Sequence, residues 1–301
     1  MNDYIDLHTH TSLTDGSMTP NALVAKANAE GLKHIALTDH NFIHTNLKSL
    51  RKQFSTIEII SGSEISASWP TTSGKKEIHI VGLFLDEGNQ HLQSFLSHNH
   101  DNGIQRLENM LERLAACGIT LGGCSTYQDF HSRYYPERTF IGRVQLAEIV
   151  VKEGYAATID EVLDKYIGDY GKRLAYVPSN ISFGSLDEVI KIIHSACGVA
   201  ILAHPLSYKL ADNEIENLIN CFIASGGDGM ECLYSRYPQT TRTALCQLAE
   251  QKEILISCGS DFHGNKDTNE HLGHYPGEYL EKIRKRHLYY AQHNTKSAVF
   301  F

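Results

Sequence analysis

Short runs of apolar residues recur along the chain, and several of them follow an amphipathic segment that closes with glycine. Thr19-Pro20 is typical of a helix start and Gly31 of a helix end, and an apolar run comes directly afterwards. The capping box Ser185-Leu186-Asp187-Glu188 begins a second such helix, which stops at Gly198. The pattern predicts strands at residues 3–10, 34–38, 57–66, 77–85, 199–203, 229–234 and 254–257.

Apolar strands that alternate with helices are typical of a parallel sheet covered by helices. Some seven strands in a chain of 301 residues suit a closed barrel better than an open sheet. No G-x-G-x-x-G segment follows the first strand, so the signature of a dinucleotide-binding fold is missing. We therefore expect an α/β fold, a distorted (β/α)7 TIM-like barrel.

The middle of the chain interrupts this alternation and reads as helices and loops. The spacing predicts one long helix through Leu107, Met110, Leu111 and Leu114, a second near 143–153 and a third that opens at Thr158. The strand pattern then resumes, which indicates an inserted, mainly helical subdomain. We expect a first barrel part at 1–87, the insertion at 88–184 and a second barrel part at 185–301. An insertion at the carboxyl ends of barrel strands overhangs the active site.

Composition and charge exclude several classes of protein. With 42% apolar and 21% charged residues, the chain is neither disordered, collagen-like nor a coiled coil. A formal net charge of -8 argues against binding to long duplex nucleic acid. None of the seven cysteines forms a C-x-x-C pair. Because no apolar run is long enough to span a membrane and no signal peptide is recognisable, we expect a cytoplasmic protein without a membrane partner.

Histidine and acidic residues gather at the ends of the predicted strands. His8 and His10 are two residues apart on a strand, so both imidazoles point the same way, roughly 6–7 Å apart, and can reach one cation. Residues at the same end of successive barrel strands meet at one rim. Nine residues are expected there as metal ligands: His8, His10, Asp15, His40, Glu64, His79, His204, Asp261 and His263.

Nine ligands exceed the four that one zinc ion usually takes, so the sequence predicts two or three divalent cations bridged by carboxylates. Mixed imidazole and carboxylate ligands suit zinc, manganese or iron better than magnesium or calcium. Adjacent cations stabilise both oxygens of a phosphoryl displacement and lower the pKa of bound water to about 7. Three such ions would also offset most of the negative charge, so that an anionic substrate could approach.

Six segments of the chain together resemble the PHP (polymerase and histidinol phosphatase) family of metal-dependent phosphoesterases. They are His8-Thr9-His10, Asp15-Gly16-Ser17, Thr38-Asp39-His40, Gly62-Ser63-Glu64, Ala203-His204-Pro205 and Gly259-Ser260-Asp261-Phe262-His263. The resemblance implies a trinuclear site. One metal takes His8, His10, Glu64 and Asp261, the second Glu64, His79 and His204, and the third Asp15, His40 and His263.

The inserted block and the segment Lys165-Tyr166-Ile167-Gly168 resemble the branch of this family that acts on nucleotides and short RNA. Arg143, Arg106 and Lys172 lie in the block and are expected to bind substrate phosphate. In that branch the residues after Ile141-Gly142-Arg143 usually read Pro-His, but here they are Val144-Gln145. The change removes an imidazole that could contact the substrate or donate a proton.

We therefore expect a phosphoesterase whose metal-bridging hydroxide attacks phosphorus in line. The residues expected to take part in catalysis are Asp15, His40, Glu64, Asp261 and His263. Nucleotides, nucleoside bisphosphates and short oligonucleotides are the favoured substrates. A small-metabolite phosphatase of the histidinol-phosphate type is the alternative within enzymes. A metal-binding interaction module that has lost catalysis is the alternative from another class.

Overall fold

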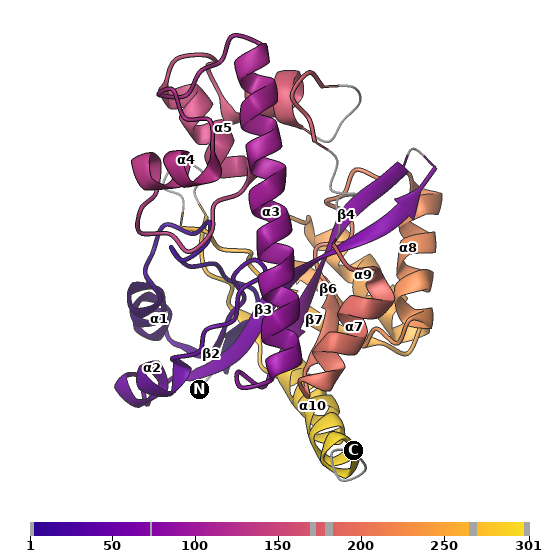
Figure 1. Ribbon diagram of the computed structural model, residues 1–301. Helices are drawn as coiled ribbons and strands as arrows, with labels where there is room; N and C mark the ends of the chain where they lie inside the picture. Colours follow the sequence, from indigo (N-terminus) through magenta and orange to yellow (C-terminus); the bar gives the residue numbers. More distant parts are fainter. Residues whose placement is uncertain (1–2, 73, 169–172, 178–182, 265–269, 298–301) are drawn as a thin grey trace.

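The fold is built around one eight-stranded sheet that curls into a nearly closed barrel (Figure 1). A computed structural model describes residues 3–72, 74–168, 173–177, 183–264 and 270–297. The strand order in the sheet is β7-β6-β5-β4-β3-β2-β1-β8. The strands are β1 Tyr4–Asp6, β2 Leu32–Leu37, β3 Glu58–Thr71, β4 Gly74–Leu83, β5 Val199–Leu202, β6 Gly229–Tyr234, β7 Leu255–Gly259 and β8 Tyr275–Pro276.

The two sides of the sheet meet just beyond β1 and β7. Thr9 and Phe262 form a parallel bridge there, and the amide of His10 donates to the Phe262 carbonyl over 2.9 Å. The amide of Asp261 donates to the His8 carbonyl, also over 2.9 Å. These bonds join the segments that carry several of the predicted ligands, and the distorted barrel expected from the strand count is confirmed.

The prediction of a parallel sheet is wrong for β4, which runs antiparallel to both β3 and β5. Only two residues separate the end of β3 at Thr71 from the start of β4 at Gly74. A parallel crossover needs a dozen or more residues, so a connection this short can form only a hairpin. The other pairs among β1 to β7 are parallel, and the short β8 pairs antiparallel with β1.

Within the described residues, six helices belong to the barrel: α1 Pro20–Ala29, α2 Leu47–Gln53, α7 Leu186–Ser195, α8 Asp212–Ala224, α9 Gln239–Gln251 and α10 Glu278–Ser297. The helix starts read from the sequence are present, since Thr19 caps α1 and the capping box of Ser185 and Glu188 caps α7. The sequence did not single out α2 or α8. Helix α2 has no side-chain cap bond, whereas at the start of α8 the Glu214 side chain accepts from the Ala211 amide over 3.4 Å. Among the described residues, no helix is both long enough and apolar enough to cross a membrane.

The inserted helices are α3 Gln90–Ala116, α4 Tyr127–Tyr134, α5 Arg143–Lys152 and α6 Ile159–Val162, which continues as the π-helical turn η1 Leu163–Ile167. Figure 1 shows α3 running from the barrel to the other inserted helices. Leu92 and Leu96, near its start, pack in the same core as α7, whereas Leu107 and Leu114 pack with α4 and α5. The long helix therefore belongs to both hydrophobic cores, and the domain boundaries expected from the sequence stay a prediction.

Candidate metal centre

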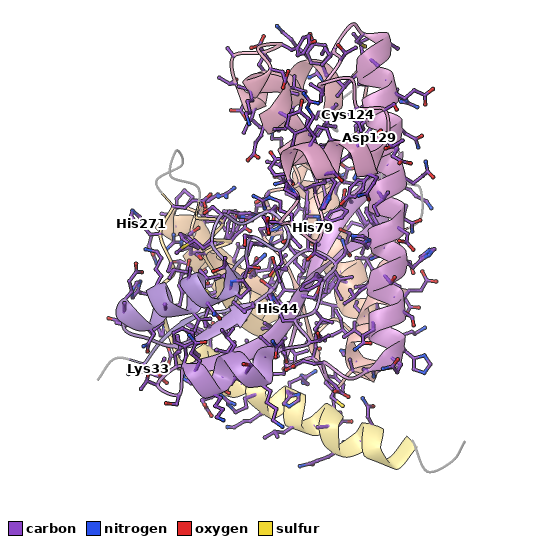
Figure 2. The ribbon with its side chains drawn as sticks, turned by 60° about the vertical axis from the view of Figure 1, so that its left-hand side comes forward. Lys33, His44, His79, Cys124, Asp129 and His271 are labelled. Carbon is purple, nitrogen blue, oxygen red and sulfur yellow. The ribbon has the colours of Figure 1, made fainter. Side chains whose placement is uncertain are left out.

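The nine predicted ligands come together at one end of the barrel, beside the insertion. They lie in or just beyond β1, β2, β3, β4, β5 and β7, so most are positioned by the ends of neighbouring strands. His204 joins them through its contact with Glu64. Figure 2 shows His79 where the barrel meets the inserted helices, whose outer part is marked by Cys124 and Asp129. The strands thus bring together imidazoles and carboxylates that lie up to 255 residues apart in the chain, from His8 to His263.

The first cluster consists of His8, His10, Glu64 and Asp261, all of them buried. Glu64 Oε2 lies 3.2 Å from His8 Nε2 and 3.2 Å from His10 Nε2. Asp261 Oδ1 lies 3.2 Å from His10 Nε2. One potential ligand atom of each residue lies within 4.8 Å of the others, which is the separation expected around one small cation.

The second cluster consists of His10, Asp15, His40 and His263. Asp15 Oδ2 lies 3.0 Å from His263 Nε2 and 3.3 Å from His40 Nε2. Its other oxygen, Oδ1, lies 3.3 Å from His10 Nδ1. His10 therefore belongs to two clusters, with one ring nitrogen turned toward each.

The third cluster brings His79 to Glu64, with His40 beside them. His79 Nδ1 and His204 Nε2 lie 2.8 Å and 2.9 Å from Glu64 Oε1. His40 Nδ1 lies 3.2 Å from the other oxygen, Oε2. Glu64 thus lies between the first and third clusters, with both of its oxygens surrounded by imidazole nitrogens.

The carboxylates of the three clusters are ionised at neutral pH. Burial, the largest influence on each, raises the pKa of Asp15, Glu64 and Asp261, but the neighbouring imidazoles outweigh it and hold each pKa well below its usual value. Burial lowers the pKa of His8, His10, His79 and His263, yet the neighbouring carboxylates raise each pKa above its usual value, that of His79 to about 10. Protonated imidazoles therefore balance the carboxylates, and a bound cation would replace those protons.

The residues present fit a group of divalent cations. His204 Nδ1 is buried and makes no hydrogen bond within the described parts of the chain; Glu64 Oε2 makes none either, although three imidazole nitrogens lie 3.2 Å from it. A buried polar atom without a hydrogen bond costs free energy unless a ligand or ion satisfies it. The donor set of imidazole nitrogens and carboxylate oxygens is the one that zinc, manganese and iron accept.

Two of the candidate ligands sit on an unusual backbone. Asp261 has φ of +57° and His204 has φ of +28°, both in the left-handed region that L-residues rarely adopt. Such conformations cost about 1–3 kcal/mol each and cluster at functional sites. The fold therefore holds both side chains in place against a local preference.

Buried hydrogen bonds fix the loops that carry the ligands. Asp39 accepts from the Thr11 amide over 2.9 Å and from His44 Nε2 over 2.6 Å. It also accepts from the hydroxyls of Thr11 and Thr14. Sequence reasoning gave His44 no role, because nothing in its spacing marks it as a partner of Asp39.

Asp6 ties β1 to the loop that follows β7. Its two oxygens accept from the amide of Ser260 over 2.9 Å and from the amide of Gly273 over 2.7 Å, and the Ser260 hydroxyl donates as well. Burial outweighs these hydrogen bonds and raises the pKa of Asp6 to about 6. This carboxyl supports the segment that ends in Asp261, and its position within an apolar strand gave no sign of that role.

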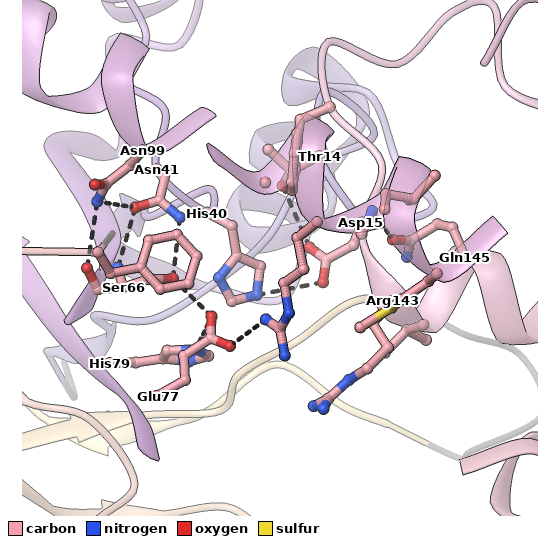
Figure 3. A pocket seen from close by; sticks show the side chains of 18 residues that line it. Thr14, Asp15, His40, Asn41, Ser66, Glu77, His79, Asn99, Arg143 and Gln145 are labelled. Carbon is pink, nitrogen blue, oxygen red and sulfur yellow. Dashed lines mark hydrogen bonds and ion pairs between the residues drawn. The ribbon is translucent and has the colours of Figure 1, made fainter. Parts of the chain in front are cut away.

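A cavity of about 140 Å³ opens beside the second and third clusters (Figure 3). Asp15, His40 and His79 line one side of it, and residues of α3 and the start of α5 line the other. Figure 3 shows a hydrogen-bonded series along one wall, running from Asn99 through Asn41 and Ser66 to Glu77. Leu107, Met110 and Phe140 supply apolar surface.

The structure places the three predicted substrate-binding residues differently. Arg143 lies at the start of α5 and lines the cavity. Arg106 also lines it, but its side chain donates to Glu77 Oε2 over 2.7 Å and to the Val177 carbonyl over 3.0 Å. Lys172 lies outside the described residues. Only Arg143 and Arg106 can therefore be placed at the cavity.

Gln145 is a buried cap of α5 and not an exposed polar group. Its Oε1 accepts from the Gly142 amide over 2.9 Å, and only 2% of the residue is exposed. Val144, by contrast, is 43% exposed and lines the cavity. The pair Val144-Gln145 therefore gives the cavity an apolar rim and a helix cap, but no group that titrates near neutral pH.

Comparisons with known proteins agree with this geometry. The PHP domain family matches residues 6–231. The 5'-3' exoribonuclease Rnm of Escherichia coli is 32% identical over 261 residues, covering 86% of this chain and 84% of that protein. The 3',5'-nucleoside bisphosphate phosphatase of Chromobacterium violaceum is 30% identical over 274 residues, covering 90% of each.

A solved structure is similar over nearly the whole fold. It is an amidohydrolase from Chromobacterium violaceum with bound sulfate and no metal, and it superposes with a TM-score of 0.77 at 27% identity. The match covers 94% of this chain and 96% of that one. The similarity therefore extends over both the barrel and the inserted helices.

Proposed function

The chain belongs to the PHP domain family, and from that premise we propose that it is a metal-dependent phosphoesterase acting on nucleotides, nucleoside bisphosphates or short oligonucleotides. One observation carries the proposal: three clusters of imidazoles and carboxylates share residues at the side of one cavity. Relatives named as an exoribonuclease and a nucleoside bisphosphate phosphatase support the same class of substrate.

Two or three divalent cations, zinc, manganese or iron, would be held by the nine residues at the rim. The proposed ligands are His8, His10, Asp15, His40, Glu64, His79, His204, Asp261 and His263. Bound cations of this kind polarise a phosphoryl oxygen and lower the pKa of water. We assign direct parts in catalysis to Asp15, His40, Glu64, Asp261 and His263, each of which belongs to one or two of the clusters.

The substrate would lie in the cavity between the rim and the insertion. Arg143 would hold a phosphate oxygen at the start of α5, where helix amides also favour an anion. Arg106 would add positive charge, reduced by its ion pair with Glu77. Leu107, Met110 and Phe140 offer apolar surface against which a base or ribose would pack.

The proton for the leaving group would come from an imidazole or from water. Gln145 is a neutral amide already bonded to the Gly142 amide, so it supplies none. His40 and His79 are the histidines that line the cavity.

A phosphatase for histidinol phosphate is the second candidate, since its phosphate would fit the same cluster. That substrate carries an ammonium group, and two arginines line the cavity into which it would extend. Asp15 and Glu77 line the same cavity, and Glu77 pairs with Arg106, so the substrate panel and not the charge of the cavity separates the two candidates.

The experiment combines elemental analysis with a substrate panel. The purified protein, with manganese or zinc added, is assayed on a nucleoside 3',5'-bisphosphate, a short 5'-phosphorylated RNA and histidinol phosphate. We expect turnover of the first or second substrate and at least two bound ions per chain. Glu64→Gln should lower kcat/KM by about 10³-fold, because metal-assisted charge stabilisation is worth several kcal/mol. Glu58→Gln, on the same strand but paired with Arg284, is the matched control.

Each other outcome has a clear meaning. Turnover of histidinol phosphate alone would overturn the assignment to nucleotides. Tight cation binding without hydrolysis of any ester would favour the metal-binding module that has lost catalysis. Full activity in Glu64→Gln would contradict the proposed role of the cluster.

A further inference from the structure

Strand β6 carries a buried carboxylate that is not one of the nine proposed ligands. Glu231 is 1% exposed, and its Oε1 lies 2.8 Å from His8 Nδ1. Its Oε2 accepts from the backbone amide of His204 over 2.7 Å. One carboxylate thus contacts the ring of one proposed ligand and the backbone of another.

Three residues further along the same strand, Tyr234 contacts a third proposed ligand. Its hydroxyl donates to Asp261 Oδ2 over 2.8 Å, and the residue is 2% exposed. The other oxygen of Asp261, Oδ1, faces His10 in the first cluster. The tyrosine therefore occupies the oxygen that is turned away from the cluster.

Residues three apart on a regular strand point to opposite faces of a sheet, so a local irregularity is needed for both to reach the same site. The register between β6 and β7 shifts between Glu231 and Leu233. Glu231 pairs with Ser257, and Tyr234 pairs with Gly259. Ser257 and Gly259 are two apart on β7 and share a face, so Glu231 and Tyr234 share it too. One extra residue in β6, a β-bulge, turns both side chains toward the ligands.

Gly259 leaves the space that this arrangement needs. A Cβ atom at that position would lie 2.3 Å from the Cβ of His8 and 2.6 Å from Glu231 Oε1. Both distances are far shorter than carbon and oxygen atoms tolerate. The motif glycine of β7 and the bulge of β6 are therefore parts of one packing arrangement around His8.

We propose that Glu231 and Tyr234 are positioning residues, re-aimed by the β6 bulge, that fix His8 and Asp261 for cation binding. The proposal rests on the proposed function, since it assumes the same metal site. With Nδ1–H of His8 donated to Glu231, the lone pair of Nε2 faces the first cluster. With its Oδ2 held by Tyr234, Asp261 presents Oδ1. Outer contacts of this kind orient metal ligands, and their loss typically costs about 10–100-fold in metal affinity or activity.

Glu231→Gln changes two atoms of the carboxylate and little of its volume. The carboxylate accepts at both oxygens, but an amide has one acceptor and one donor. If its oxygen keeps the His204 amide, its NH2 faces His8 Nδ1 and moves the ring proton to Nε2, the atom that faces the cluster. If the amide is reversed, two N–H groups oppose each other at His204. Neither orientation preserves the present contacts.

The test measures cation binding and not activity alone. Mn²⁺ affinity and stoichiometry are determined by calorimetry, and the visible spectrum of the Co²⁺-loaded protein reports ligand geometry. We expect Glu231→Gln to weaken Mn²⁺ binding about 10–100-fold. Tyr234→Phe should weaken it less than Glu231→Gln and should alter the Co²⁺ spectrum. Unfolding temperatures without metal show how much of each change comes from the fold.

Tyr237→Phe is the matched control. Tyr237 packs against Tyr234 with ring centroids 4.8 Å apart, and its hydroxyl accepts from the Leu206 amide over 2.8 Å; within the described residues its hydroxyl and ring contacts are with Tyr234, Leu206 and Ser207. This variant should lose stability but keep the wild-type affinity and spectrum. Wild-type affinity and spectrum in both Glu231→Gln and Tyr234→Phe would overturn the positioning roles. A wild-type protein that binds cations but cleaves no phosphate ester overturns the proposed function alone, because the affinity comparison still tests the positioning roles.

Discussion

Two parts of the molecule face the same cavity but are held in place in different ways. One is the barrel rim, which carries the nine proposed ligands, and the other is the wall formed by the inserted helices. At the rim, Glu64 and Asp261 are buried, and each contacts several imidazoles fixed by neighbouring strands. In the wall, Arg143 and Gln145 stand at the start of one helix, α5, whose packing belongs to a separate hydrophobic core. The rim is thus fixed by the ladder of the sheet, whereas the wall depends on how the inserted helices pack.

This difference suggests a division of work. The rim is set by backbone register, so small displacements there should disturb every cluster at once. The wall presents side chains from helices and loops, so single changes there should alter what is bound and leave the clusters intact. Loops and insertions on a rigid scaffold are where substrate preference commonly varies.

Among the changes that test this comparison, the largest expected effect comes from filling the space at Gly259. Gly259→Ala places a methyl group against His8 and Glu231, and we expect a loss of about 1–3 kcal/mol in stability from overpacking. Metal-dependent hydrolysis should fall by about 10²-fold or more, because a displacement near 1 Å at a reacting site has that cost. Gly88→Ala is the control, since its Cβ would meet only Asp86, at 3.4 Å. Normal activity in Gly259→Ala would show that the rim tolerates displacement.

An intermediate effect is expected in the wall. Arg143→Ala should raise KM by about 10–100-fold, the worth of one hydrogen bond to a charged group, and change kcat less. Cation stoichiometry should stay at the wild-type value, because no cluster includes this residue. Lys152→Ala, at the exposed end of the same helix, should behave as wild type. A drop in bound metal would contradict the separation of rim and wall.

The smallest effect lies at the foot of β3, away from both. Hydrogen bonds from His34 and Arg284 lower the pKa of Glu58 from 4.5 to about 2. A carboxyl group whose pKa is lower in the folded than in the unfolded chain stabilises the fold at pH values above its unfolded pKa. This contribution disappears as the pH falls from 4.5 towards 2. Glu58→Gln should therefore lower the free energy of unfolding near pH 7 by the ~0.2–1 kcal/mol of an exposed ion pair, and the melting temperature should fall slightly with it.

Melting curves between pH 7 and pH 3 check this sign. The difference in melting temperature between wild type and Glu58→Gln should become smaller as the pH falls below about 4.5. Glu281→Gln removes a more exposed carboxylate near the same arginine and should show no such narrowing. A gap that widened in acid would mean that the pair does not stabilise the fold.

Much of the barrel could be predicted because its signals are local. The seven main strands and the family itself follow from short motifs and are confirmed. The ligand roles of the nine rim residues stay a prediction, although the structure brings all nine together. The predicted direction of β4 was wrong, because a hydrophobic run does not show whether a strand is parallel or antiparallel to its neighbours.

The supporting residues could not be predicted, and the reason is register. Glu231 and Tyr234 lie in an apolar strand, and their approach to His8 and Asp261 depends on one extra residue that the hydrophobic pattern does not mark. The partner of Arg106 is likewise hidden, since Glu77 lies 29 residues away on a strand whose direction was mistaken. Contacts of this kind are set by how elements meet, not by the spacing within them.

The loop that carries Asp15 is hydrogen-bonded to the insertion. The amides of Thr139 and Phe140 donate to the Leu13 carbonyl over 2.6 Å and 3.1 Å, and Arg138 donates to the carbonyls of Thr14 and Gly16. Undocking the inserted helices would remove these hydrogen bonds and leave the loop held by Asp39, while His8, Glu64 and Asp261 kept their strand contacts. Cation occupancy would then report whether the inserted helices are docked on the barrel. A chain with undocked helices would lose the cation beside Asp15 before the other cations.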